Sequence, residues 1–424
     1  ILNLIRDLQA ELKMALLLIT HDLGVVANMA QTVVVMYHGR IVESGASPDL
    51  FSKPGHPYLR ALFKAVPRFG MEPSERLVPV RTIEHELGEH FQAPSSVTAP
   101  GEPLLEVHRL CKTFAIRGTG LFRRSESTEV KAVDDVSFSI QRGECLGLVG
   151  ESGCGKTTVS KILMRALSPD SGSVQFHDQG QAHDLLSLDN DSMMAMRRKM
   201  QLIFQDPFSS LSPRMTVFDI VREPLVIHQR GDAASQRELV QELMRLVGLD
   251  PRFLSRYPHS FSGGQRQRIS IARALVLQPQ LLICDEPVSA LDVSIQAQVL
   301  NLLKDLKSEL GLTYLFISHN LAVIDYIADR VAVMHRGRLV EIASRDQLFS
   351  NPAHPYTRSL LQAVPHPDLD KPLDFAAITA SGGNDPDQWP AAFQLDPDSA
   401  VQWLDLGQGH RVRARDNANP GEIF

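Results

Sequence analysis

The first residues of the chain alternate between apolar and polar types with a helical period. The apolar positions of this stretch are Ile1, Leu4, Ile5, Leu8 and Leu12. This spacing predicts an amphipathic helix. The apolar run that begins at Leu16 predicts a short buried strand, which ends in the polar residues Thr20, His21 and Asp22. Another helix and a β-hairpin turned at Gly39 are expected to follow.

The same pattern occurs a second time near the other end of the chain. "ILNLIRDLQAELKMALLLITHDLGVV" aligns without a gap with "VLNLLKDLKSELGLTYLFISHNLAVI", and His21 and His319 lie 298 residues apart. About half of the positions in this repeat are identical, and the second hairpin turns at Gly337. Residues 1–68 are therefore predicted to be the C-terminal part of a first copy of the fold, and His21 to be the remnant of a site. Because the sequence begins with Ile, it is expected to belong to a longer chain or to lack its start.

A glycine-rich loop lies upstream of the second repeat unit, between a predicted strand and a predicted helix. The stretch "GLVGESGCGKTT" holds the pattern G-x-x-x-x-G-K-[ST], which is typical of a loop that binds nucleotide phosphates. Backbone N–H groups of such a loop surround the phosphates, its lysine reaches the β- and γ-phosphates, and its threonine hydroxyl can ligate Mg²⁺. The loop residues predicted to bind the nucleotide are Gly150, Glu151, Ser152, Gly153, Cys154, Gly155, Lys156, Thr157 and Thr158.

Two acids and a glutamine are expected to complete the site that the phosphate-binding loop begins. The apolar run Leu281 to Cys284 predicts a buried parallel strand, and Asp285 and Glu286 follow it directly. Asp285 is predicted to hold Mg²⁺, directly or through water, and Glu286 to polarise an attacking water as a general base. Gln205, at the end of another strand, could ligate the metal or position that water.

A second glycine-rich turn opens a helix further along the chain. The turn in "FSGGQRQRISIARAL" comprises Ser262, Gly263, Gly264 and Gln265. The N-terminus of a helix that starts in this way favours the binding of a phosphate group. A nucleotide that is already held by one phosphate-binding loop does not need this second turn. The turn has a use if it faces a nucleotide held by another copy of the domain.

Together these motifs resemble the ATP-binding subunits of ABC transporters over residues 104–365. The resemblance implies an α/β P-loop NTPase fold with a helical subdomain around residues 206–262. The roles it implies are Gly150–Thr158 as the Walker A loop, Gln205 as the Q-loop, Ser262–Gln265 as the signature, Asp285 as the Walker B aspartate, Glu286 as the catalytic glutamate, Ser289–Asp292 as the D-loop and His319 as the switch histidine. Phe114 matches the aromatic residue that stacks on adenine, although Phe122 is close by. The chain departs from the family at Asn320, where Asp is usual.

A His-Pro-Tyr segment narrows the resemblance to the oligopeptide, dipeptide and nickel importers. It occurs in "KPGHPYLRALFKAVP" and again in "NPAHPYTRSLLQAVP". By its physical pattern alone this segment is a helix that starts after Pro57 or Pro355 and packs against the domain. Both interpretations can hold together.

The motifs divide the chain into five predicted parts. Residues 1–68 form the incomplete first copy, and the polar, proline-rich residues 69–102 form a linker. Residues 103–350 form a complete nucleotide-binding domain, and residues 351–372 form the His-Pro-Tyr extension. The tail, residues 373–424, has no assigned role; it is either partly disordered or packs its tryptophans on the body.

Composition limits the partners. The net charge is −6, so no global basic field points to nucleic acid or to an anionic membrane. No apolar run approaches the roughly 18 to 20 residues of a membrane span. The 4 cysteines form no metal motif and fit a reducing compartment.

The family resemblance implies ATP and Mg²⁺ as cofactors and ATP hydrolysis coupled to solute import. Implied partners are integral-membrane permease subunits, an extracytoplasmic binding protein acting indirectly, and a second nucleotide-binding domain in a head-to-tail dimer, at the cytoplasmic face of the inner membrane. Peptide, nickel, glutathione and opine-like solutes all stay open. The rival interpretations are a soluble ABC ATPase without a transporter and a binding subunit that does not hydrolyse ATP.

Overall fold

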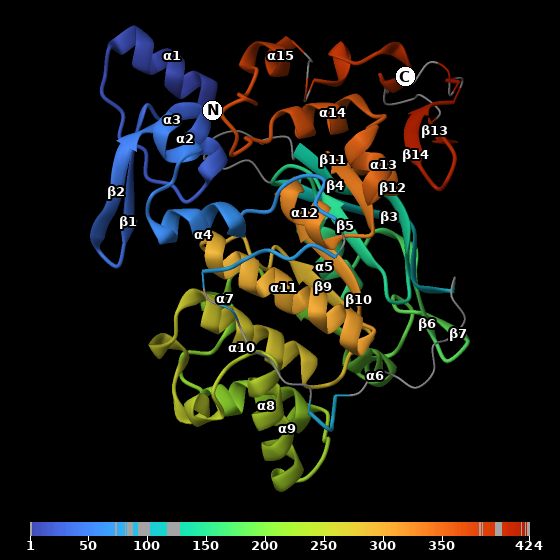
Figure 1. Cartoon of the computed structure of the whole chain (residues 1–424). Coiled ribbons are helices and arrows are strands. Elements are labelled where there is room, and N and C mark those ends of the chain that lie inside the picture. The colour runs from blue at the N-terminus through green and yellow to red at the C-terminus, as the bar shows by residue number, and fades with distance from the viewer. Residues whose placement is uncertain are drawn as a thin grey trace, which may run out of the picture.

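The computed structural model describes most of the chain. The described residues are 2–72, 74–80, 82, 88–91, 102–116, 128–380, 383, 385–394, 401–416, 418–419 and 421. Figure 1 shows a small lobe built from the first residues beside a larger body, which consists of two sheets with helices packed around them.

An eight-stranded sheet forms the centre of the body. Its strands run in the order β13-β14-β12-β11-β5-β10-β9-β8. The bounds are β5 Cys145–Val149, β8 Met200–Ile203, β9 Leu281–Asp285, β10 Thr313–Ser318, β11 Arg330–His335, β12 Arg338–Ser344, β13 Val401–Asp405 and β14 Arg411–Arg415. The strands from β11 to β8 are parallel. All side chains of β5, β9 and β10 are buried, as their continuous apolar runs predict.

A second, antiparallel sheet packs on the first. It has four strands in the order β4-β3-β6-β7. Their bounds are β3 Pro103–Ile116, β4 Thr128–Gln141, β6 Ser171–Asp178 and β7 Gln181–Asp184. Its apolar side chains share one buried cluster with β5, β9 and β10, so the two sheets enclose a common core.

Helices cover the sheets and form a separate helical region. The helices beside the sheets are α5 Lys156–Leu163, α6 Asn190–Lys199, α11 Val293–Leu310, α12 Leu321–Ile327, α13 Arg345–Ser350 and α14 Pro355–Gln362. Helix α15 Phe375–Ala380 lies away from the sheets, where the Arg6 guanidinium stands 4.5 Å from the ring centroid of Phe375. The helical region contains α7 Pro207–Ser210, α8 Val217–Ile227, α9 Ala233–Leu246, η1 Pro251–Ser255, η2 Pro258–Ser260 and α10 Gly263–Leu275. The expected helical subdomain around residues 206–262 is thus present (Figure 1).

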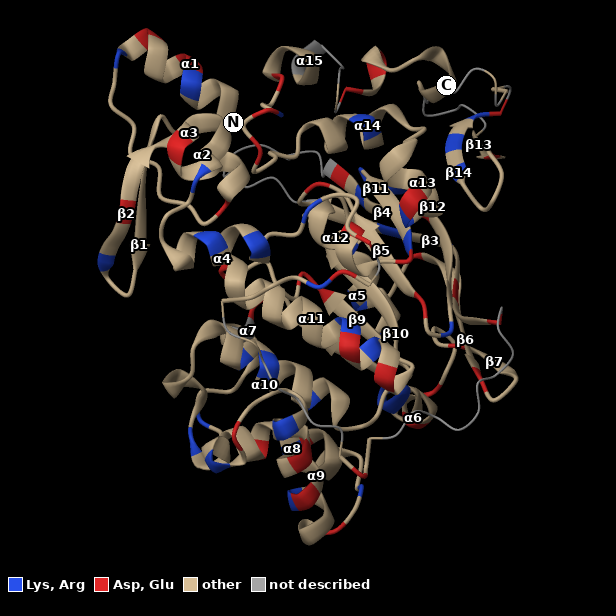
Figure 2. Cartoon of the chain, in the orientation of Figure 1, with Lys and Arg blue, Asp and Glu red and all other residues tan. Residues whose placement is uncertain are grey.

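Charges of both signs are spread over these elements. Figure 2 shows basic and acidic residues side by side on helices such as α8 and α9.

The first copy forms the small lobe. Its elements are α1 Leu2–Leu12, α2 Leu23–Met29, β1 Thr32–Tyr37, β2 Arg40–Ala46, α3 Ser47–Ser52 and α4 Pro57–Ala65. The hairpin β1–β2 has a register shift between Val35 and Met36, and β11–β12 has the same shift between Val333 and Met334. The repeat predicted from the sequence is therefore also a structural repeat.

One prediction for the first copy is wrong. The apolar run from Leu16 to Ile19 forms no strand, and Leu17 and Ile19 are 85% and 88% exposed. Their counterparts Leu315 and Ile317 are fully buried in β10, which bonds to β5 on one edge and β9 on the other. Within residues 2–72 no strand stands in for β5 or β9, so the run lacks the hydrogen-bond partners that would make it a strand.

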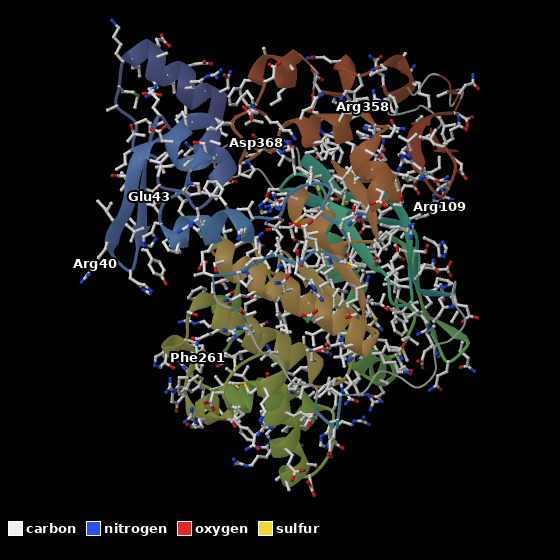
Figure 3. The ribbon with its side chains drawn as sticks, in the orientation of Figure 1. Arg40, Glu43, Arg109, Phe261, Arg358 and Asp368 are labelled. Carbon is white, nitrogen blue, oxygen red and sulfur yellow. The ribbon has the colours of Figure 1, made fainter. Side chains whose placement is uncertain are left out.

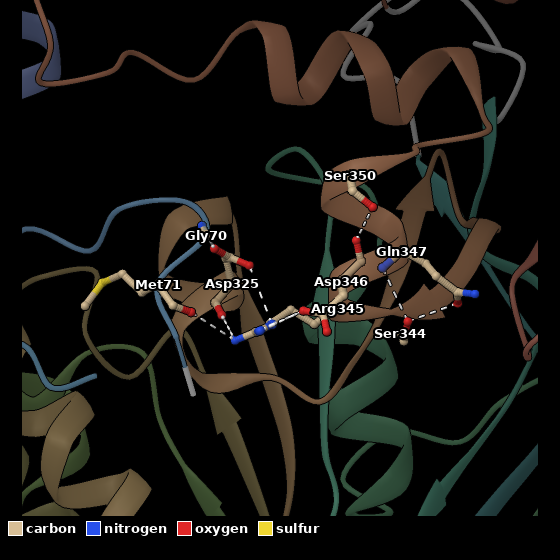
Figure 4. A network of polar contacts seen from close by, with 8 residues as sticks. All are labelled: Gly70, Met71, Asp325, Ser344, Arg345, Asp346, Gln347 and Ser350. Atoms are coloured by element: carbon tan, nitrogen blue, oxygen red, sulfur yellow. Dashed lines mark hydrogen bonds and ion pairs between the residues drawn. The ribbon is translucent and has the colours of Figure 1, made fainter. Parts of the chain in front are cut away.

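The predicted linker is bound to the body along much of its described length. Figure 4 shows its start: the N–H of Gly70 donates to Asp325 Oδ2 over 2.7 Å, and Arg345 donates to the carbonyl of Met71 over 3.4 Å. Further on, Asn301 Nδ2 donates to the carbonyl of Leu77 over 2.9 Å. Met71, Leu77 and Phe91 belong to the buried core. The sequence analysis treated this segment only as a connection, and the buried anchors add a structural role.

The tail also packs on the body in its described part. Its short 3₁₀ helices are η3 Pro386–Gln388 and η4 Ala391–Phe393. Trp389 and Phe393 are buried against His354, with ring centroids 4.8 and 4.9 Å away. Strands β13 and β14 continue the central sheet beyond β12. Of the two alternatives for the tail, the described residues favour the packed one.

The buried anchor of the linker can be tested by truncation. Leu77 is 2% exposed, whereas its neighbour Val78 is 52% exposed. We expect Leu77→Ala to lower the free energy of unfolding by about 2–5 kcal/mol because it leaves a cavity. Val78→Ala is the matched control and should cost less than about 0.5 kcal/mol. Urea unfolding followed by circular dichroism measures both, and equal effects would contradict the anchoring role.

Candidate functional site

The phosphate loop, residues Gly150–Thr158, connects β5 to α5. Gly150, Gly153 and Gly155 have φ of 151°, 83° and 112°. A Cβ at Gly150 would lie 2.1 Å from the carbonyl oxygen of Met334, and one at Gly155 would lie 2.0 Å from that of Ala132. Only glycine fits at positions 150 and 155, because both the backbone conformation and the available space exclude a side chain there. The backbone of the loop can therefore lie close against β11 and β4 at these two glycines.

Lys156 lies at the start of α5 and is buried. Its Nζ donates to the carbonyl oxygens of Gly150 and Glu151 over 2.7 and 2.8 Å, and it lies 3.7 Å from Cys154 Sγ. The ammonium group therefore stands inside the loop and is held by the loop's own backbone. A phosphate entering the loop would meet a positive charge that is already in place.

Asp285 ends β9 beside the start of α5. Thr157 Oγ1 donates to Asp285 Oδ1 over 3.3 Å, and Ser160 Oγ donates to Oδ2 over 3.2 Å. Burial raises the pKa of this carboxyl, and the two hydroxyl bonds oppose that shift. The sequence analysis paired Thr157 with Asp285 and missed Ser160. Its position one helical turn after Thr157 was the available signal, because residues three apart share a helix face.

Glu286 is the meeting point of the three predicted catalytic residues. Gln205 Nε2 donates to Glu286 Oε2 over 2.8 Å, and His319 Nδ1 lies 2.9 Å from Glu286 Oε1. The bond from His319 lowers the pKa of Glu286, and the same bond raises the pKa of His319. Glu286 has φ of 48°, an uncommon backbone for a non-glycine residue at the end of a strand. Gln205, 81 positions before Glu286, and His319, 33 positions after it, thus converge on one carboxylate.

The turn Ser262–Gln265 opens α10 within the helical region. Ser262 Oγ accepts from the N–H of Gln265 over 3.3 Å, and Gln265 Oε1 accepts from the N–H of Ser262 over 3.0 Å. These two reciprocal bonds between Ser262 and Gln265 form a capping box, which stabilises the turn. A Cβ at Gly264 would lie 2.0 Å from Ile295 Cγ2, so this glycine permits close packing of α10 on α11. The predicted part in nucleotide binding, for Ser262, Gly263, Gly264 and Gln265 alike, stays a prediction.

Phe114 lies near the end of β3 and is 39% exposed. The ammonium of Lys112 stands 5.7 Å from its ring centroid. An exposed ring of this kind is able to stack on a base, and the stacking of Phe114 on adenine stays a prediction. The alternative, Phe122, lies outside the described residues.

The departure at Asn320 has a simple structural account. Asn320 is the N-cap of α12, and its Oδ1 accepts from the N–H groups of Ala322 and Val323 over 3.0 and 3.3 Å. In the first copy Asp22 caps α2 in the same way. Both amide and carboxylate oxygens serve as N-caps, so the substitution keeps the helix start next to His319.

The His-Pro-Tyr segment is a capping device that the sequence analysis missed. His354 is the N-cap of α14, and its Nδ1 accepts from the N–H of Tyr356 over 3.1 Å. Glu341, fully buried on β12, accepts from the N–H groups of Ala353 and His354 over 2.7 and 3.0 Å. Burial holds the pKa of His354 well below its usual value, which keeps Nδ1 free to accept. The signal was present in the proline at the first helical position, since the residue before it is then the N-cap.

The first copy repeats this device. Glu43 accepts from the N–H groups of Gly55 and His56 over 2.8 Å each, and His56 Nδ1 caps α4 over 3.1 Å. Figure 3 shows Glu43 on the β1–β2 hairpin of the small lobe and Arg358 on α14 of the body. In both copies the extension is therefore fixed to the hairpin that precedes it.

In the part of the chain that the structure describes, no group of three or more His, Cys, Asp or Glu side chains is arranged to hold a metal ion. The described helices include none with the length and apolarity that crossing a bilayer requires.

Comparison with known proteins adds independent information. Residues 133–289 match the model of the family described as ABC transporter, and residues 42–92 and 340–388 both match the one described as oligopeptide/dipeptide transporter, C-terminal region. The glutathione import ATP-binding protein GsiA of Shigella flexneri is 48% identical over 368 residues, which are 86% of this chain and 58% of that protein. The protein of the same name from Escherichia coli strain K12 has the same identity and coverage. The chain thus spans less than two thirds of these relatives.

A solved structure of a protein from an ABC transporter complex has a similar fold. The cbiO1 protein of Clostridium perfringens, described as part of the ABC transporter complex cbiONQ, superposes with a TM-score of 0.50 and 25% identity. The match covers 59% of this chain and 92% of that one.

The contact between Glu286 and His319 gives a testable pKa prediction. The Glu286 carboxylate is the main cause of the raised pKa of His319, so the ring keeps its proton to a higher pH than a free histidine does. We expect Glu286→Gln to lower the pKa of His319, measured by NMR titration of the histidine ring protons. Gln205→Ala leaves the carboxylate in place and is the control. An unchanged titration in Glu286→Gln would contradict the pairing.

Proposed function

The chain belongs to the ATP-binding proteins of the ABC transporter family, in the oligopeptide/dipeptide group, and on this premise we propose that it binds and hydrolyses ATP to power import of a small solute. Peptides, including glutathione, are the solute class that the comparisons favour. The observation that carries the proposal is the Glu286 carboxylate, held by His319 and Gln205 at the same sheet edge as the phosphate loop.

The proposed reaction uses Glu286 as the base. Because the bond from His319 lowers its pKa, the carboxylate stays ionised at neutral pH. It accepts a proton from a water molecule whose oxygen attacks the γ-phosphorus of ATP. The bond from that phosphorus to the oxygen bridging the β- and γ-phosphates breaks, which leaves ADP and phosphate. Lys156 neutralises charge on the phosphates, and Gln205 and His319 orient the carboxylate.

The residues present also fit a magnesium ion. Thr157 Oγ1 and Asp285 Oδ1 lie 3.3 Å apart, and both are the hard oxygen donors that Mg²⁺ prefers. Gln205 is a third candidate ligand, through its amide oxygen, although its amide nitrogen bonds Glu286 in this structure. When bound, the metal neutralises phosphate charge and aligns the β- and γ-phosphates.

A complete site would need a second nucleotide-binding domain. By the family resemblance, the turn Ser262–Gln265 acts on a nucleotide bound to the partner domain rather than on its own. The first copy, residues 1–68, contains a counterpart of His319 in His21 but no phosphate loop, acid pair or signature turn. We therefore assign ATP binding to the second copy alone.

The helical region offers a place for a membrane partner. A cavity of about 350 Å³ lies between α8 and the segment before it. Its lining residues are Arg214, Met215, Asp219, Arg222, Glu223, Val226 and Ile227. Exposed apolar side chains at its rim and charges of both signs suit a short helix of a permease subunit. This docking would hold the chain at the cytoplasmic face of the inner membrane, with the extracytoplasmic binding protein reached only through the permease.

A soluble ABC ATPase without a transporter is the second candidate. The two His-Pro-Tyr extensions favour the transport role, since they match the oligopeptide/dipeptide transporter family. Co-purification after mild detergent extraction separates the two candidates. Integral membrane proteins retained with the chain would support the transporter, and their absence would favour the soluble factor.

Removal of the base gives a direct test of the hydrolysis mechanism. We expect Glu286→Gln to reduce ATP turnover about 10²- to 10⁴-fold, because the amide does not accept the proton of the water. Binding of ATP should stay unchanged, since Glu286 is not a predicted phosphate ligand. Release of phosphate and equilibrium binding measure the two quantities. Turnover at the wild-type rate would remove Glu286 from this role.

The assignment of ATP to one copy gives a stoichiometry. Titration calorimetry with Mg²⁺ and ATP should find one nucleotide per chain. Lys156→Ala should weaken that binding about ten- to a hundredfold, because it removes a charged donor to phosphate. His21→Ala, in the first copy, is the matched control and should bind as the wild type does. A second nucleotide that survives in Lys156→Ala would contradict the assignment.

A further inference from the structure

The tyrosine of the His-Pro-Tyr extension contacts the phosphate loop directly. The backbone N–H of Glu151, the second residue of the loop, donates to the hydroxyl oxygen of Tyr356 over 3.1 Å. Tyr356 is 1% exposed whereas Glu151 is exposed, so the bond joins a buried side chain to a loop at the surface. The two residues are separated by 205 positions in the sequence, and this bond joins the extension to the nucleotide site.

Tyr356 and Lys156 both bond to the backbone of Glu151. The carbonyl of Glu151 accepts from Lys156 Nζ over 2.8 Å, so Glu151 is held through its N–H by Tyr356 and through its carbonyl by the lysine. Gly150 precedes Glu151 and Gly153 follows it two positions later, and glycine allows many backbone conformations, which an external bond restricts. Tyr356 therefore restrains the first part of the loop.

The tyrosine itself is rigidly placed. Its helix is capped by His354 and tied through Glu341 to β12, and β12 pairs through β11 with β5, the strand that leads into the loop. The ring of Tyr356 lies 4.3 Å from that of His335, centroid to centroid. Trp389 of the tail packs against both His335 and His354, with centroids 5.3 and 4.8 Å away. Each end of the Tyr356–Glu151 bond is thus anchored to the same sheet.

We propose that Tyr356 is a positioning residue for the phosphate loop: its hydroxyl holds the Glu151 peptide in the conformation that receives the phosphates of ATP. The inference rests on the proposed function, because it names a support of the same nucleotide site. The extension then tunes nucleotide affinity in addition to packing on the domain. The hydroxyl is the group responsible, since the ring alone would satisfy the packing.

The variant Tyr356→Phe isolates this hydroxyl, and Tyr58→Phe is the matched control. Tyr58 occupies the same position in the first copy and stacks on Tyr37 with centroids 4.2 Å apart. We expect Tyr356→Phe to raise the KM for ATP about three- to tenfold while kcat stays nearly unchanged, because one hydrogen bond that orients the loop is lost. Tyr58→Phe should change neither quantity.

A second measurement does not depend on ATP hydrolysis. Hydrogen–deuterium exchange of the full chain without nucleotide should show a faster-exchanging Glu151 amide in Tyr356→Phe than in the wild type, by about three- to tenfold. If the wild type does not bind ATP, the proposed function fails, and this exchange rate still decides whether Tyr356 holds the loop. Unchanged exchange, equal effects of the two variants, or a fall in kcat at constant KM would each overturn the inference.

Discussion

The backbone hydrogen bonds between β5, β10 and β9 are the interaction on which the rest of the structure depends. These strands are parallel and adjacent, so their carboxyl ends meet at one edge of the sheet. The phosphate loop follows β5, Asp285 and Glu286 end β9 or follow it, and His319 follows β10. The arrangement of these residues is therefore a consequence of strand order. The helices and the second sheet pack around the strands, exclude water from them and hold their order.

The motifs with fixed spacing were open to prediction from the sequence. The loop at Gly150, the acids after Cys284 and the helix start at Ser262 each carry a local signal, because glycine, proline and a terminal acid have position-specific roles. Gln205 was singled out at the end of a predicted strand and His319 in the repeat, the family resemblance then gave both a role, and the structure places both on Glu286. Ser160, Glu341 and Tyr356 were not assigned a role at the site. Ser160 and Tyr356 bond to residues 125 and 205 positions away, and for Ser160 only its helical spacing from Thr157 was a local signal. Glu341 bonds to N–H groups 12 and 13 positions away, and no motif marks that contact.

The comparison of the two copies shows how far sequence determines a strand. Leu17 and Leu315 occupy equivalent positions in similar apolar runs, yet only the second lies in a strand. An apolar run specifies a preference, and the neighbouring strands supply the hydrogen bonds that realise it. The elements closed by local contacts behave differently. The hairpin with its bulge and the histidine-capped helix form in both copies, because the bonds that close them in both copies join residues at most 14 positions apart.

The hairpin β13–β14 has one more consequence. Strand β12 would otherwise be the border of the central sheet, with unpaired N–H and C=O groups available to any other extended chain. Glu341 and Ile342 of β12 pair with β14, and β14 pairs in turn with β13, so β13 becomes the last strand of the sheet. The hairpin thus moves the border of the sheet two strands outward and withdraws the backbone of β12 at these two residues from pairing with another extended chain.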